Sequence, residues 1–111
     1  MVASALLVAL IAAATVSIRE FDLPTRDARP HDPAVAPDAS LWVTEQQGNK
    51  LASFNGATMA FENEFLVPTP NSAPNDIVFG PNFFLWFTEL NADKVTSFDP
   101  NTTAFAEQPV P

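Results

Sequence analysis

The sequence predicts an all-β chain built from β-propeller blades, and three observations lead to this class. The segment Leu41-Trp42-Val43-Thr44-Glu45 returns as Leu85-Trp86-Phe87-Thr88-Glu89, an offset of 44 residues. Two units, residues 25–68 and 69–111, align on one another at this offset without a gap. A period of roughly 40–50 residues with one tryptophan-bearing strand in each unit is typical of propeller blades. The chain is therefore predicted to be a partial propeller of two blades.

Residues 1–17 are predicted to be a secretory signal peptide. Val2–Val16 is an apolar run without charge, and it contains Ala12-Ala13-Ala14, a small-residue cleavage pattern. No Lys or Arg precedes the run, so a retained membrane anchor and a mis-assigned start codon are the alternatives. The prediction is a secreted protein.

Residues 18–24 are predicted to form one further strand, as a partial third copy of the repeat. Phe21-x-x-Pro24 matches Phe65-x-x-Pro68 at the same offset of 44. Propeller rings often close by letting an N-terminal strand complete the last blade. Propellers have about four to eight blades, so two blades leave two faces uncovered. We therefore expect a fragment or a subunit, which needs further blades or self-association to cover these faces.

Each unit is predicted to hold four antiparallel strands joined by turns. The predicted strand pairs are Pro33–Ala36 and Ile77–Phe79, Leu41–Thr44 and Leu85–Thr88, Lys50–Phe54 and Lys94–Phe98, and Ala60–Val67 and Ala104–Val110. The third pair alternates polar and apolar residues, as half-buried strands do. Gly80-Pro81-Asn82 and Asn55-Gly56 have the composition of turns. Trp42 and Trp86 are predicted to fill the space between neighbouring blades, because large rings pack well in such wedges.

Composition excludes several classes of function. The chain has 13 acidic and 5 basic residues and a formal net charge of −8, which repels nucleic acid and anionic lipid. It has no cysteine, so disulfides, thiolate metal sites and thiol nucleophiles are absent from its chemistry. The expected partners are small molecules and other blades, and nucleic acid is not among them.

The two units also resemble blades of the virginiamycin B lyase (streptogramin lyase) propellers. The resemblance covers residues 18–111. The segments that carry it are Asp27-Ala28-Arg29-Pro30-His31, Leu41–Glu45, Gly48–Leu51, Thr69–Asn75, Leu85–Glu89 and Asn91–Lys94. It implies a seven-bladed, Mg²⁺-dependent ring that opens a cyclic depsipeptide antibiotic by elimination. Histidines at several Pro-His positions would then face a central funnel, and glutamates would hold the metal.

The resemblance assigns roles to four residues. His31 takes the Pro-His position, which implies a contact with substrate, and an imidazole suits proton abstraction near neutral pH. Asn75 replaces it in the second unit and offers hydrogen bonds but no base. Glu45 and Glu89 each follow these positions by 14 residues and are weak candidate Mg²⁺ ligands. Arg29 stands two residues before His31, where the family has a metal-binding glutamate.

Three functions are compatible with these residues. The first is a secreted streptogramin-lyase-like propeller that is inactive as this chain alone, because no catalytic set is complete. The second is a non-catalytic propeller that binds a cyclic peptide, another small ligand or a partner, since fold does not fix function. The third is a relative of the sugar-lactone hydrolases. A metal requirement would separate the enzymes from the binding protein.

Overall fold

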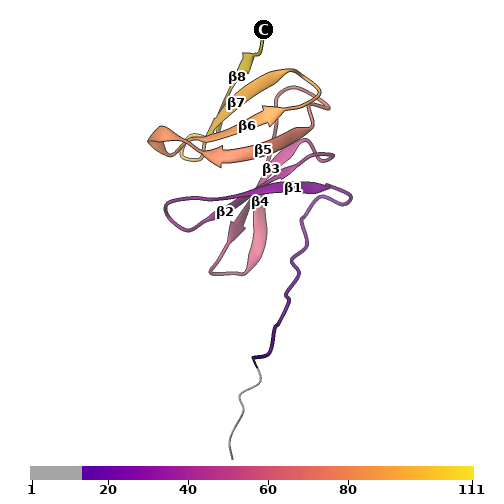
Figure 1. The fold of residues 1–111 in the computed structure, drawn as a ribbon, viewed down its shortest axis with the longest axis vertical. Helices are drawn as coiled ribbons and strands as arrows, with labels where there is room; N and C mark the ends of the chain where they lie inside the picture. Colours follow the sequence, from indigo (N-terminus) through magenta and orange to yellow (C-terminus); the bar gives the residue numbers. More distant parts are fainter. Residues whose placement is uncertain (1–13) are drawn as a thin grey trace, which may run out of the picture.

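The computed structural model describes residues 14–111 and shows two four-stranded antiparallel sheets. Figure 1 shows the sheets stacked face to face, with the second above the first. In each sheet the strands follow chain order, β1-β2-β3-β4 and β5-β6-β7-β8. Each sheet falls inside one of the two sequence units. The predicted class, a partial propeller of four-stranded blades, is confirmed.

The strands match the predicted ones within a few residues. Their bounds are β1 (Pro30–Val35), β2 (Leu41–Glu45), β3 (Lys50–Asn55) and β4 (Ala60–Leu66), then β5 (Pro74–Phe79), β6 (Leu85–Glu89), β7 (Lys94–Asp99) and β8 (Ala104–Pro109). We call β1–β4 blade 1 and β5–β8 blade 2. A short 3₁₀ turn, η1 (Pro81–Phe83), lies in the predicted turn between β5 and β6.

The outer hairpins are closed by side chains that cap their own turns. In blade 1, the Asn55 side chain accepts the backbone N–H of Ala57 at 2.8 Å. In blade 2, Asp99 takes this place and accepts the N–H of Asn101 at 2.9 Å. Such Asx turns reverse the chain without help from the rest of the fold. The hairpin ends are therefore fixed locally by sequence.

The hydrophobic core lies between the two blades. Trp42, on β2, is 6% exposed and stacks on Phe65 of its own blade. It also contacts Phe98 of blade 2, with ring centroids 5.6 Å apart. The predicted packing between blades is thus observed for Trp42. Trp86 faces the opposite side of blade 2, where it lies over the backbone of Gly80 and, within residues 14–111, meets no further blade.

The repeat is interrupted by one residue in the fourth strand, so the gap-free alignment of the two units is wrong at this point. In blade 1, Phe61 pairs with Phe54 and Asn63 with Ser53, which leaves Glu62 as a bulge. In blade 2, β8 pairs with β7 without a shift. As a result, Glu64 is the structural counterpart of Glu107, an offset of 43 rather than 44.

Residues 18–24 form no strand in the described chain, contrary to prediction. They leave the sheets as an extended tail (Figure 1). Phe21 nevertheless packs edge-on against Phe54 with centroids 5.0 Å apart, and Phe65 lies 5.0 Å from Phe98 one repeat later. Phe21 thus contacts blade 1 at the position equivalent to that where Phe65 of β4 contacts blade 2. Ladder hydrogen bonds need a neighbouring strand, and residues 14–111 provide none for residues 18–24.

The predicted signal peptide, residues 1–17, falls mostly outside the described residues. Among those that the structure does describe, no helix has the length and apolar character needed to cross a membrane.

Candidate functional site

The predicted site residues lie at one end of the blade pair. Strand register pairs Pro30 with Glu45 and Pro74 with Glu89. The starts of β1 and β5 and the ends of β2 and β6 therefore share one end, which we call the His31 end. β1 and β5 lie against each other (Figure 1), so that His31 and Asn75 occupy equivalent places on adjacent strands.

His31 and Asn75 differ in their surroundings. His31 is exposed on β1, whereas Asn75 is partly buried and held from two sides. The Gln46 side chain donates from Nε2 to Asn75 Oδ1 at 3.0 Å. The Thr44 hydroxyl donates to the backbone carbonyl of Asn75 at 2.7 Å. Both bonds join blade 1 to blade 2, so the amide of Asn75 is fixed in orientation.

Gln46 is a site residue that sequence reasoning missed. It directly follows the repeated strand, but its counterpart in blade 2 is Leu90, so the repeat carries no signal for it. With Arg29, Gln47, Ala73, Leu90 and Asn91 it lines a hollow of about 260 Å³ at the His31 end. A guanidinium and several amides around such a hollow can donate hydrogen bonds to carbonyl oxygens of a ligand.

Glu45 and Glu89, the candidate metal ligands, are buried inside their blades. Glu45 is 0% exposed, and neither of its carboxylate oxygens finds a hydrogen-bond partner in the described part of the chain. Burial, reinforced by the neighbouring Glu64, raises the pKa of Glu45 to about 8. At neutral pH it is therefore mostly a neutral acid.

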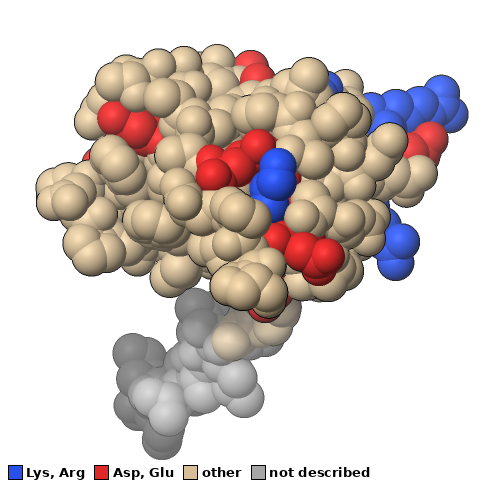
Figure 2. Space-filling view, turned by 90° about the horizontal axis from the view of Figure 1, so that it is seen from above, with Lys and Arg blue, Asp and Glu red and all other residues tan. Residues whose placement is uncertain are grey.

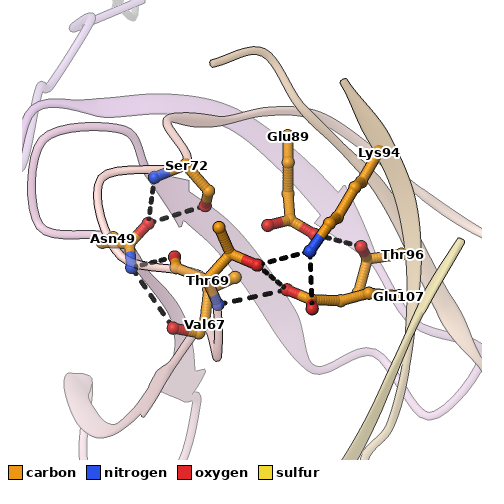
Figure 3. A network of polar contacts seen from close by, with 8 residues as sticks. All are labelled: Asn49, Val67, Thr69, Ser72, Glu89, Lys94, Thr96 and Glu107. Carbon is orange, nitrogen blue, oxygen red and sulfur yellow. Dashed lines mark hydrogen bonds and ion pairs between the residues drawn. The ribbon is translucent and has the colours of Figure 1, made fainter. Parts of the chain in front are cut away.

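Glu89 is 1% exposed and, unlike Glu45, has a hydrogen-bond partner. The Thr96 hydroxyl donates to one of its oxygens, as Figure 3 shows. Burial still raises the pKa of Glu89, although the hydrogen bond from Thr96 acts in the other direction. Each of the two glutamates is thus enclosed within its own blade, whereas His31 is exposed.

A repeated polar tie closes each blade beside these glutamates. In blade 2, Thr69 donates its hydroxyl to Glu107 at 2.7 Å, and Lys94 forms an ion pair with Glu107 at 3.1 Å. Figure 3 shows this cluster between the strands. In blade 1, the equivalent residues are Thr25, Lys50 and Glu64. These bonds hold the loop that precedes the first strand of each blade against the fourth strand of that blade. Their role is therefore structural.

The Asn49 side chain joins the two blades below the same loops. Its Nδ2 donates to the carbonyls of Val67 and Thr69 at 3.2 and 2.9 Å. Its Oδ1 accepts both the backbone N–H and the hydroxyl of Ser72, at 2.9 and 2.7 Å (Figure 3). All its polar atoms are thus used to hold the connection between β4 and β5.

These residues do not fit a Mg²⁺ site. A hard cation needs several carboxylate or carbonyl oxygens around one point, but Glu45 and Glu89 are each enclosed within their own blade, 0% and 1% exposed. Among residues 14–111, no group of three or more His, Asp or Glu side chains could hold a metal ion.

No basic patch is visible on the face of the molecule that Figure 2 shows. That face is mostly uncharged, with scattered acidic groups and few Lys or Arg side chains. With a net charge of −8, it offers little attraction to polyanions.

Comparisons with known proteins agree with this geometry. No protein-family model matches the sequence, and no curated protein matches it either. Among solved structures, a catalytically inactive virginiamycin B lyase from Staphylococcus aureus with quinupristin is similar at a TM-score of 0.80 and 29% identity, over 89% of this chain and 33% of that one. The selenomethionine-substituted virginiamycin B lyase from the same organism is similar at 0.77 and 30%, over 86% and 31%.

The hydrazine synthase of Kuenenia stuttgartiensis shares the fold at a TM-score of 0.67 and 20% identity, over 86% of this chain and 27% of that one. The chain thus spans about a third of the lyases it matches. The resemblance to virginiamycin B lyase propellers is confirmed for these two blades.

Proposed function

We propose that this chain forms two blades of a streptogramin-lyase-like propeller and that its His31 end is a ligand-contacting wall without catalytic activity of its own. The observation that carries the proposal is the hydrogen bond from Gln46 to Asn75, which joins both blades beside the exposed His31. The similarity to the virginiamycin B lyases supports the propeller part of the proposal.

The chemistry of the His31 end suits a ligand rich in carbonyl groups. Arg29 and Gln47 are exposed there and carry hydrogen-bond donors without a net negative charge. A cyclic depsipeptide presents amide and ester carbonyls to such a wall. His31 adds a further donor or acceptor at the same place.

The same residues argue against catalysis by this chain alone. Eliminative ring opening needs a base that removes a proton next to a carbonyl and a group that polarises that carbonyl. The sequence has one histidine, and Asn75 takes no proton at neutral pH. The glutamates nearest to this end are buried in their blades.

Export remains part of the proposal, because the apolar run of residues 2–16 has the character of a signal peptide. Expression of the whole chain with N-terminal sequencing of the exported product tests it. A mature chain beginning at Thr15 or Ile18 is expected, and an uncleaved chain retained in the membrane would contradict it.

The ligand proposal is tested by calorimetric titration of the purified chain with quinupristin. We expect measurable binding that is weakened by His31→Ala and by Gln46→Leu, the residue type of blade 2 at this position. Asn101→Ala, in a turn at the opposite end, is the matched control and should bind normally. If no binding occurs, or if all three variants bind equally, the ligand wall is refuted.

Mass spectrometry of the same mixture with Mg²⁺ tests the absence of activity. Elimination gives a linear product of unchanged mass, and hydrolysis gives one heavier by one water. We expect neither product. A linear product that disappears with His31→Ala would overturn the proposal and show that this chain is an enzyme.

A further inference from the structure

A pocket lies between the two blades at the end opposite to the His31 end. It has a volume of about 220 Å³ and is formed by the β1–β2 turn of blade 1, the β5–β6 and β7–β8 turns of blade 2 and the strand ends beside them. We call it the turn pocket. An apolar cavity of about 150 Å³ is enough to hold a benzene ring, so the turn pocket has room for one aromatic ring and a small substituent.

Aromatic side chains from both blades line the turn pocket. Trp42 comes from blade 1, and Phe79 and Phe83 come from blade 2. Phe83 is 64% exposed and has a left-handed backbone with a φ of 62°, which is unfavourable for a bulky residue. Ala39 takes the equivalent position in blade 1 with a φ of 69°, so the turn itself does not require an aromatic ring. The exposed ring of Phe83 is thus free to pack on a ligand.

The carboxylate of Asp38 lines the same pocket and is held in place by its neighbours. The Ser40 hydroxyl and backbone N–H both donate to Asp38 Oδ1, at 2.6 and 2.9 Å. These bonds lower the pKa of Asp38, so it is ionised at neutral pH. Ser40 Oγ in turn accepts the indole N–H of Trp42 at 3.2 Å. Asp38 takes part in neither ion pair of residues 14–111, and Oδ2 is left to meet a ligand.

This line of polar groups is particular to blade 1. In blade 2, Asn82 and Phe84 replace Asp38 and Ser40 at the offset of 44. The indole N–H of Trp86 is then buried without an acceptor in the described chain. The second blade forms its β5–β6 turn without the carboxylate, so the charge of Asp38 is not a requirement of the blade architecture.

We propose that the turn pocket binds a small organic cation, an arylalkylammonium ion. The aromatic ring of the ligand packs on Phe79 and Phe83, and its ammonium group donates a hydrogen bond to Asp38 Oδ2. Nearby aromatic faces add a favourable electrostatic contact with the cation. No Lys or Arg lines the pocket, and the net charge of −8 favours the approach of cations over anions.

Titration of the whole chain with 2-phenylethylammonium, followed by ¹H–¹⁵N NMR, tests the proposal. We expect saturable shifts of the backbone amides of Ser40 and Phe83. The neutral analogue of the same size, 2-phenylethanol, should bind about threefold more weakly, because an ion pair with an exposed carboxylate contributes modestly. The anion 3-phenylpropionate should not bind. Added salt should weaken binding of the ammonium ion and leave that of the alcohol unchanged.

Two variants assign the contacts, and a third is the matched control. Asp38→Asn keeps the oxygen that caps the turn but removes the charge, so it should bind the ammonium ion and the alcohol equally. Phe83→Ala introduces the residue type of blade 1 at this position and should weaken binding of both about fivefold. Asp93→Asn removes the charge of an exposed residue at the His31 end, where blade 1 has Asn49, and should bind normally.

Circular dichroism checks that each variant is folded, and the comparison of the two ligands on the unaltered chain needs no variant. The proposal is overturned if no saturable binding occurs or if the shifts lie away from the turn pocket. It is also overturned if the ammonium ion binds no more tightly than the alcohol, or if Asp38→Asn and Asp93→Asn weaken its binding equally.

Discussion

Ala52 in β3 and Thr96 in β7 stand 44 residues apart at equivalent positions, and this difference changes the surroundings of the two buried glutamates. The Thr96 hydroxyl donates to Glu89. Ala52 has no such group, and both carboxylate oxygens of Glu45 lack a partner in the described chain. A buried polar group without a hydrogen bond lowers the free energy of unfolding. Glu45 should therefore destabilise blade 1 more than Glu89 destabilises blade 2.

The substitution Ala52→Thr should therefore stabilise the chain, and more so at high pH. The pKa of Glu45 is raised from 4.5 to about 8 on folding, so the folded chain retains a proton that the unfolded chain loses, and stability falls as pH rises through this window. A hydroxyl at position 52 favours the ionised acid and lowers its pKa. We expect a gain of about 1.5 kcal/mol at the upper end of the window and little at the lower end, measured by urea unfolding at several pH values.

Thr96→Ala provides the matched control, because it removes the hydroxyl from blade 2. It should destabilise the chain and steepen the loss of stability with pH. If Ala52→Thr destabilises equally at all pH values, the added methyl overfills the fully buried site, and the hydrogen-bond argument fails.

The fourth strand shows how one residue alters an element. In β4, Glu62 is unpaired, and the Asn55 side chain donates to its carboxylate at 2.9 Å at the exposed edge of the blade. The bulge restores the register, so that Glu64 still meets Thr25 and Lys50. β8 reaches the same contacts from Glu107 without the extra residue. The bulge is thus an addition that the blade does not require.

Deletion of Glu62 should give a blade 1 that folds like blade 2, at a cost of about 1 kcal/mol or less in unfolding free energy. The control is deletion of Ala106 from β8, which has no bulge to absorb it. That deletion turns Glu107 to the opposite face, breaks its contacts with Thr69 and Lys94, and should cost at least about 2 kcal/mol. The measurement is the unfolding free energy of both variants in urea. If the two deletions lower it equally, the role given to Glu62 is contradicted.

The contrast between β4 and β8 also shows what the sequence could predict. Repeated residues such as Trp42 recur at a fixed period, so the two blades can be predicted from them. Turn residues such as Asn55 act locally, so the hairpins can be predicted as well. The bulge at Glu62 was missed because Phe61, just before it, still matches Phe105 at the offset of 44. The residues after it match at an offset of 43, as Glu64 does with Glu107 and Val67-Pro68 with Val110-Pro111. The contact of Gln46 with Asn75 has no counterpart in blade 2 and depends on how the blades are stacked.

The burial of Glu45 was equally hidden. The resemblance implies a metal-ligand role for Glu45, whereas the structure encloses it within blade 1, beside Gly48 of the following loop. Site residues that depend on contacts between loops of different units are therefore the least accessible to sequence reasoning.

At the scale of the whole molecule, stability depends on the contact between the blades. The buried apolar cluster combines residues of both sheets, among them Trp42, Leu51, Ile77, Phe87 and Phe98. A repeat array derives its stability from its units and from the interfaces between neighbours. Since each blade here has one neighbour in the described chain, loss of this interface should unfold both blades together.

Phe98→Ala tests this coupling, with Phe54→Ala as its control one repeat earlier. Phe98 is fully buried and packs on Trp42, Phe65 and Phe105, so its truncation should cost about 3–5 kcal/mol. Phe54 is half-buried and packs only on Phe21 and Phe61 among the described aromatic residues, so it should cost about half as much. Amide hydrogen exchange of Phe98→Ala should show β2 and β6 losing protection in parallel. If β6 loses protection while β2 keeps it, each blade is stable on its own and the interface is not the source of stability.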